Sequence, residues 1–183
     1  MDENQIKRLV EKTIVEIQRK ENSVLHQSEV VPRTIKPHHI ETVFGNMYAY
    51  QAAITVTVAA ADTWYEVTSG LTDGGQSDGV VFQNSHELKV NYGGKFLAVW
   101  SLSFSTASAN QELMGGIGVN GTINTASVGE SVDSTANDAM TTSGNIILNL
   151  SAGDLVSFFV HNETLSTDIV IEHATLTLIR IGR

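Results

Sequence analysis

From residue 42 onward, apolar and polar residues alternate along the chain with the period of two that β-strands impose. The stretch 142–160 is the clearest case, because two alternating runs flank Ala152, Gly153 and Asp154, residue types that favour a tight turn. The apolar positions of the two runs are Ile146, Leu148, Leu150, Val156, Phe158 and Val160. The pattern predicts a β-hairpin at the centre of an all-β domain.

A longer alternating run follows Gly93 and Gly94 and predicts the longest strand of the domain. One of its faces is apolar and rich in aromatic residues, as expected of a core strand: Phe96, Ala98, Trp100, Leu102 and Phe104. Further strand candidates are 54–58, 64–67, 80–82, 88–92, 113–119 and 122–128, whereas 71–79 and 130–142 have the composition of exposed loops. Eight to ten strands in about 140 residues favour a jelly-roll β-sandwich.

The last predicted strand, 169–181, is apolar on both faces. Ile169, Ile171, Ile179 and Ile181 alternate there with Val170, Ala174, Leu176 and Leu178. Since a strand of this kind must be covered on both sides, we expect one face to meet the opposite sheet and the other to meet a neighbouring subunit. We predict that Phe159, Leu176 and Leu178 carry the contacts between copies.

The first 22 residues have a helical period instead. Their apolar stripe consists of Ile6, Leu9, Val10, Ile14 and Ile17. An isolated helix of this length is marginal in water, so the stripe needs a partner: its own domain, a short coiled coil, or another protein to which it anchors the chain. Residues 23–41, with Pro32 and Pro37, are interpreted as an extended linker arm, and 42–183 as a jelly-roll domain.

Composition and charge exclude several classes of function. The chain has 183 residues and a formal net charge of -9, which argues against nucleic-acid binding and against docking on anionic lipid. It contains no cysteine, so disulfides and thiolate zinc sites cannot hold it together. No run reaches the length of a signal peptide or a membrane span, so we expect a soluble, unprocessed chain without membrane insertion.

Candidate chemistry is sparse. His38, His39 and Glu41 are close in sequence, but adjacent histidines on an extended chain point to opposite sides, which favours a role other than metal binding. Asp73 and Asp78 lie in a glycine-rich loop that lacks the spacing and terminal Glu of an EF-hand. No nucleophile or phosphate-binding motif is present, and the scattered acids form no recognisable pair. We therefore predict no enzymatic activity and no cofactor.

Three short motifs carry a family resemblance. Gly94, Phe96 and Trp100 lie on the long core strand, Val119-Asn120-Gly121 forms a turn, and Ser143-Gly144 leads through alternating leucines to Gly153-Asp154-Leu155-Val156. Together these motifs resemble the jelly-roll superfamily of tumour necrosis factor and the globular heads of the first complement component, over residues 42–181. The resemblance implies a compact homotrimer with the final strand near the threefold axis and exposed loops at one end.

A short helix, an extended arm and a trimeric jelly roll are also similar in arrangement to bacteriophage virion proteins such as head fibres, capsid decoration proteins and small receptor-binding heads. By this analogy, the chain is predicted to be a structural protein on the virion exterior, attached to a capsid or tail protein through residues 1–41. The alternative is a receptor-binding head for a host surface glycan or protein. Its receptor-facing loop residues would then be Asp73, Gln76, Asp78, Asp133 and Asn137. A hydrolase of surface polysaccharide is a third, less favoured interpretation.

Overall fold

The computed structural model describes residues 12–16 and 42–182. The chain divides into two units, Met1–Glu41 and Thr42–Arg183. Within the first unit, residues 12–16 are helical and exposed. The rest of the predicted helix, with Ile6, Leu9, Val10 and Ile17, lies outside the described residues, as does the predicted arm 23–41 with His38 and His39.

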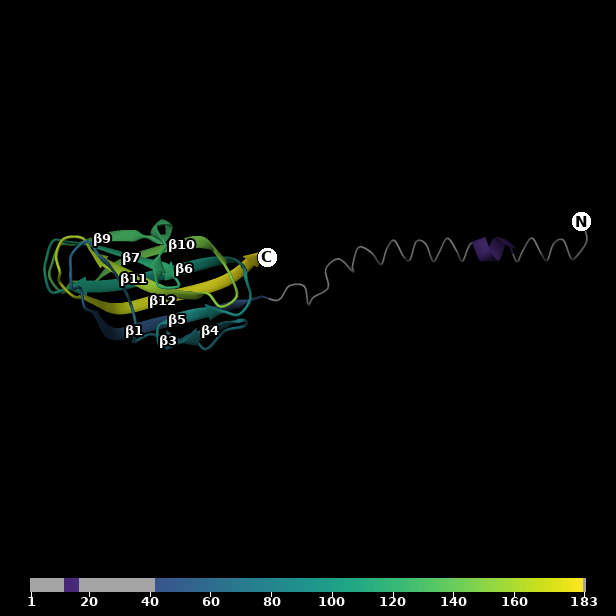
Figure 1. Ribbon diagram of the computed structural model, residues 1–183, viewed down its shortest axis with the longest axis horizontal. Helices are drawn as coiled ribbons and strands as arrows, with labels where there is room; N and C mark the ends of the chain where they lie inside the picture. The colour runs from purple at the N-terminus through teal and green to yellow at the C-terminus, as the bar shows by residue number, and fades with distance from the viewer. Residues whose placement is uncertain (1–11, 17–41, 183) are drawn as a thin grey trace, which may run out of the picture. The chain divides into compact units, whose positions relative to one another are not determined.

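The second unit is built from two antiparallel sheets packed face to face (Figure 1). Its described residues form twelve strands and one short 3₁₀ helix: β1 (Phe44–Val56), β2 (Trp64–Glu66), β3 (Thr72–Asp73), β4 (Val80–Gln83), β5 (Glu87–Val90), β6 (Gly94–Thr106), β7 (Gln111–Val119), β8 (Thr122–Ile123), η2 (Thr125–Ser127), β9 (Gly129–Asp133), β10 (Met140–Leu150), β11 (Leu155–Asn162) and β12 (Ile169–Gly182). Three of these strands, β2, β3 and β8, have only two or three residues. The count therefore exceeds the predicted eight to ten because short edge strands are included.

The strand order confirms the predicted all-β jelly roll. One sheet has the order β10-β6-β12-β1-β3. The other has the order β4-β5-β11-β7-β8, with β2 also pairing with β11 and β9 with β7. Because β10, β11 and β12 follow one another in the chain but alternate between the two sheets, the chain repeatedly crosses the sandwich, as in a jelly roll.

The predicted hairpin over 142–160 is wrong in its pairing. The turn is present, with Gly153 at a φ of 97°, and Asp154 Oδ2 accepts a hydrogen bond of 2.7 Å from the Ser151 amide. However, β10 pairs with β6, whereas β11 pairs with β7, β5 and β2. The turn therefore connects strands of different sheets, and the apolar residues of β10 and β11 line the core from opposite sheets instead of lying side by side in one sheet.

The core lies between the sheets and confirms the predicted inward face of the longest strand. Phe96, Trp100 and Phe104 of β6 are buried there and belong to one cluster with Phe158 of β11. Two other predicted segments differ in detail. Strand β9 and the start of β10 lie within 130–142, which was expected to be a loop, and 122–128 forms only the short β8 followed by η2.

The final strand is divided by a β-bulge that sequence periodicity does not reveal. The pairing of β12 with β6 shifts between Ile171 and His173. An extra residue reverses the alternation of inward and outward side chains. As a result, Ile171 before the bulge and Leu176 and Leu178 after it all point into the core, and Ile179 and Ile181 are exposed.

Candidate functional site

The outer face of the five-stranded sheet carries a row of apolar side chains. Ile147 of β10 lies opposite Leu97 of β6, Leu97 lies opposite Ile179 of β12, and Ile179 lies opposite Phe44 of β1. Residues directly opposite each other in antiparallel strands project to the same side, so the four side chains cross the whole face. Ile147 is 60% exposed. The neighbouring side chain, Val99, is 45% exposed and extends the row along β6.

Further along the strands, the same face becomes polar and aromatic. Ser103 lies opposite His173, which lies opposite Tyr50. The rings of Tyr50 and His173 meet edge to face with their centroids 5.2 Å apart, and Tyr50 is 68% exposed. The face therefore has an apolar half near Phe44 and a half of hydroxyl and aromatic groups near Tyr50.

Acidic residues are scarce in the strands around this apolar row. The segments 44–50, 95–103, 141–149 and 173–181 contain neither Asp nor Glu, although the chain has 20 acidic residues. The acids of this sheet are Glu172, at the bulge of β12, and Asp73, on the short edge strand β3. The centres of protein interfaces are depleted of charge in the same way. The apolar row and the scarcity of acids beside it together make this face the candidate assembly surface.

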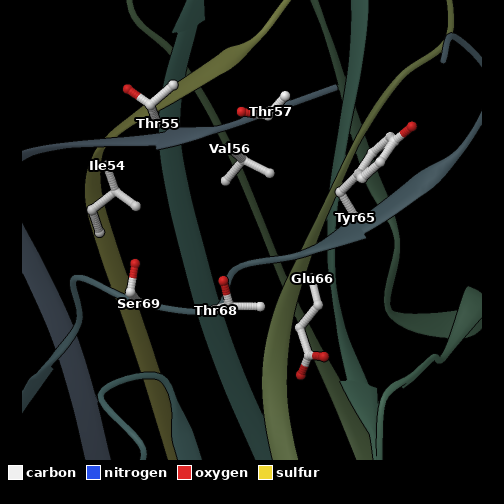
Figure 2. Close-up of a pocket in the computed structure, with 8 residues that line it drawn as sticks. All are labelled: Ile54, Thr55, Val56, Thr57, Tyr65, Glu66, Thr68 and Ser69. Carbon is white, nitrogen blue, oxygen red and sulfur yellow. The ribbon is translucent and has the colours of Figure 1, made fainter. Parts of the chain in front are cut away.

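A cleft lies between the end of β1 and the segment that follows β2 (Figure 2). Its volume is about 290 Å³. Most of its walls consist of hydroxyl-bearing side chains, namely Thr55, Thr57, Tyr65, Thr68 and Ser69, and Glu66 supplies a carboxylate. This lining can donate and accept hydrogen bonds to a polar ligand, but it contains no pair of groups suited to acid–base catalysis.

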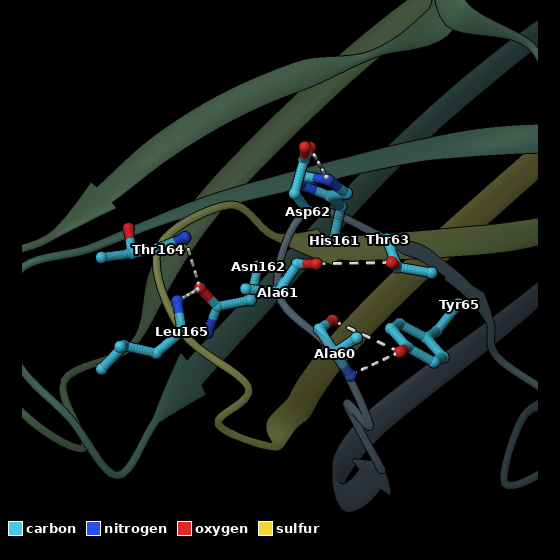
Figure 3. Close-up of polar contacts among 9 residues, drawn as sticks. All are labelled: Ala60, Ala61, Asp62, Thr63, Tyr65, His161, Asn162, Thr164 and Leu165. Carbon is cyan, nitrogen blue, oxygen red and sulfur yellow. Dashed lines mark hydrogen bonds and ion pairs between the residues drawn. The ribbon is translucent and has the colours of Figure 1, made fainter.

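A histidine–aspartate pair lies at one end of β11 (Figure 3). His161 Nε2 is 3.3 Å from Asp62 Oδ1, and the imidazole ring packs 4.9 Å from the Trp64 ring. A catalytic pair needs a nucleophile on the free ring nitrogen, but His161 Nδ1 is buried and has no hydrogen-bond partner. Thr63, which follows Asp62 in the sequence, donates its hydroxyl proton to the Ala61 carbonyl instead. Within residues 42–182 this pair therefore lacks the third group of a hydrolase.

The histidines of β11 and β12 do not form a site together, because His161 and His173 lie on strands of different sheets.

One further cluster of ionisable groups is found in the described part of the chain. Glu66, His86 and Glu87 each bring one potential ligand atom to within 4.8 Å of the other two.

The predicted trimer contacts are wrong for two of the three residues. Leu176 and Leu178 are 0% exposed in the single subunit, because the bulge in β12 turns them into its own core. Phe159 points to the outer side of β11 but is only 4% exposed, since it packs on Gly118 of β7 within the same subunit. The exposed apolar residues of the face were missed as a site, although the alternation along β6 had already placed Leu97 and Val99 opposite the core positions.

The predicted receptor-facing residues divide into two groups. Asp73, Gln76, Asp78 and Asn137 are exposed. Asp133 is 0% exposed, because it lies at the end of β9, where its Oδ1 accepts a hydrogen bond of 2.9 Å from the Thr135 amide. Asp133 is therefore unavailable to a receptor, and its prediction is corrected. Of the predicted anchoring residues, Ile14 is described and is 49% exposed.

Comparisons with known proteins find similarities among solved structures only. No protein-family model matches the chain, and no curated protein sequence matches it. Among solved structures, Eiger TNF from S. frugiperda is similar at 12% identity, with a TM-score of 0.48 over 76% of this chain and 94% of that one. Murine APRIL is similar at 10% identity, with a TM-score of 0.49 over 77% of this chain and 100% of that one. No described helix is both long and apolar enough to cross a membrane.

Proposed function

We propose that this chain is a non-enzymatic structural protein whose jelly-roll head forms a homotrimer and is displayed on the exterior of a virion through residues 1–41. The observation that carries the proposal is the apolar row on the outer face of the five-stranded sheet, with Ile147, Val99 and Ile181 exposed in the single subunit. In a chain with a net charge of -9, such a face is the part of the surface best suited to contact another copy.

Self-association follows from the physics of this face. Covering Leu97, Ile147 and Ile179 removes apolar area from water, and the row itself contains no carboxylate. The number of three copies is the stoichiometry that the motif resemblance implies. A ring of three copies closes when the face of each copy packs on a different surface of the next.

Mass photometry of the full chain tests the assembly. We expect the wild-type protein to have the mass of three 19.8 kDa chains. Ile147→Asp places a charge in the apolar row and should shift the main species to the monomer mass. Val132→Asp is a matched control, because Val132 is 59% exposed on β9 of the other sheet, and it should stay trimeric. A monomeric wild-type protein at micromolar concentration, or an Ile147→Asp trimer, would contradict the proposal.

Attachment to the particle is tested separately by deleting residues 1–41. All buried core residues of the described structure lie between Val43 and Leu178, so we expect the shortened chain to fold and to remain a trimer. It should no longer co-sediment with virus particles that lack the protein, whereas the full chain should bind them. Equal binding by the two chains would rule out the N-terminal segment as the anchor.

A second candidate function is host recognition, and the cleft between β1 and β2 favours it. The cleft presents five hydroxyl groups and one carboxylate, a lining suited to a glycan or another polar ligand. The exposed loop residues Asp73, Gln76 and Asp78 offer a further polar surface. Binding of the full chain to a glycan array or to host cells would support this function. No binding in either assay would leave particle decoration as the better interpretation.

A further inference from the structure

Two short strands share one edge of β11 and leave a gap between them. β7 pairs along one edge of β11, from Val156 to Asn162. On the opposite edge, β5 pairs with β11 at 155–156 and β2 pairs with it at 159–161. Glu66 is the last residue of β2, and Glu87 is the first residue of β5. The two carboxylates therefore meet at the gap, next to Ser157.

The turn between β4 and β5 brings an imidazole to the same place. Asn84 and Ser85 form this turn with φ values of 53° and 63°, and His86 follows them. His86 Nε2 is 3.8 Å from Glu87 Oε1. The side chains of His86 and Glu87 are only 14% and 10% exposed, so the cluster is not an ordinary solvated group of surface acids.

Each of the three side chains also has a hydrogen-bond contact with a group outside the cluster. His86 Nδ1 lies 2.6 Å from the Asn84 carbonyl oxygen, which can only accept, so Nδ1 carries a proton and, in the neutral imidazole, the lone pair is on Nε2. Asn84 Nδ2 donates to Glu87 Oε2 at 2.7 Å, and Ser157 Oγ donates to Glu66 Oε1 at 2.5 Å. Metal ligands in proteins are oriented by outer hydrogen bonds of this kind.

The three groups are close enough to share one cation. Two carboxylates and an imidazole each bring one atom to within 4.8 Å of the other two, and a positive charge between the two carboxylates relieves their mutual repulsion. A tetrahedral ion bound at about 2.1 Å holds its ligand atoms about 3.4 Å apart. The 3.8 Å separation of His86 Nε2 and Glu87 Oε1 is close to that value, so small side-chain rotations complete the geometry.

We propose that Glu66, His86 and Glu87 form a binding site for a divalent first-row transition metal, with Zn²⁺ as the best match. One imidazole nitrogen and two carboxylate oxygens suit this class of ion, whereas Ca²⁺ requires more oxygen ligands. A fourth position is left for water. The ion would join β2, which has three residues, to the β4–β5 hairpin and close the gap on the edge of β11. The site belongs to the seven-stranded sheet and does not depend on the proposed trimer.

Isothermal titration calorimetry with ZnCl₂ tests the site in the full chain. The background variant is His38→Gln/His39→Gln, which removes two other histidines as ligands. We expect one Zn²⁺ per chain, and at least tenfold weaker affinity after His86→Gln or Glu66→Gln. His173→Gln is the matched control on the other sheet and should bind as the background does. No Zn²⁺ binding at millimolar concentration, unchanged affinity after His86→Gln, or Ca²⁺ binding as tight as Zn²⁺ binding would overturn the proposal.

Thermal unfolding supplies a second measurement that is sensitive to folding defects. Glutamine at position 66 can still accept the hydrogen bond from Ser157, so the variant should fold, and circular dichroism checks this. In EDTA we expect Glu66→Gln to unfold near the wild-type temperature, because the lost charge relieves repulsion with Glu87 but weakens the hydrogen bond from Ser157. Added Zn²⁺ should raise the midpoint of the wild type by several degrees and leave that of Glu66→Gln unchanged. An equal rise in both proteins would reject the site, and mass photometry of the same variants reports the trimer independently.

Discussion

The outer faces of the two sheets differ in what covers them. On the seven-stranded sheet, Ser157, Phe159 and His161 alternate with the core residues of β11, yet they are only 1%, 4% and 4% exposed. Neighbouring segments of the same chain cover them. On the five-stranded sheet, Val99 and Ile147 occupy equivalent outward positions and are 45% and 60% exposed.

This contrast indicates which outward side chains are covered by their own chain and which remain exposed to solvent. The centre of the first face, around Phe159, is covered within one chain and has a half-buried polar cluster beside it. The centre of the second face, around Val99 and Ile147, is left uncovered in the single subunit. Substitutions on the first face should therefore affect folding, and substitutions on the second should affect association.

The largest effect is expected for Phe159→Ala. Removing a ring that is 4% exposed leaves a cavity against Gly118, and such a change costs about 3–5 kcal/mol of unfolding free energy. Urea denaturation measures it. Mass photometry below the denaturation midpoint should show unchanged stoichiometry, and loss of the trimer with full retention of stability would restore Phe159 as a contact between copies.

Leu176→Ala should cost about 2–5 kcal/mol, because Leu176 is 0% exposed in the core. The paired variant is Ile181→Ala on the same strand, where the side chain is 54% exposed and its loss should barely change the unfolding free energy of the dissociated subunit. Denaturant unfolding of both variants at low protein concentration makes the comparison. Equal losses of unfolding free energy for the two substitutions would mean that the bulge in β12 does not turn Leu176 into the core and Ile181 outward.

A smaller loss is expected for Ser157→Ala in the presence of EDTA. The Ser157 hydroxyl donates to the Glu66 carboxylate at 2.5 Å, and a hydrogen bond to a charged group contributes about 1.5–3 kcal/mol. Ser131→Ala is the control, because that hydroxyl donates at 3.2 Å to the Thr141 carbonyl in an exposed setting. Similar losses of unfolding free energy for both serines would show that the hydrogen bond to the Glu66 carboxylate is no more stabilising than an exposed hydrogen bond to a carbonyl.

The smallest effect on folding is expected for Val99→Thr. Its side chain is 45% exposed on the open face, so the unfolding free energy of the dissociated subunit should change by less than about 0.5 kcal/mol. The trimer, in contrast, should dissociate at a higher protein concentration than the wild type does, which dilution series in mass photometry can follow. A lower unfolding free energy with unchanged dissociation would show that Val99 contributes to folding and not to contacts between copies.

Sequence periodicity alone determined the class of fold and most of its core. Alternation along 96–104 was sufficient to identify Phe96, Trp100 and Phe104 as buried, and the turn residues at 120–121 and 152–154 were sufficient to place the ends of strands. These features are local, because a strand exposes alternate residues on opposite sides wherever it lies.

Three features were decided only by the tertiary structure. The partner of β10 is β6 and not β11, the bulge in β12 turns Leu176 inward, and Glu66 meets His86 and Glu87 across a gap in the edge of β11. Each depends on pairing between segments that are far apart along the chain or on a one-residue change of register, and neither leaves a periodic signal in the sequence. For this reason the residues that cover one face, and the apolar side chains left exposed on the other, could be identified only once the strands were paired.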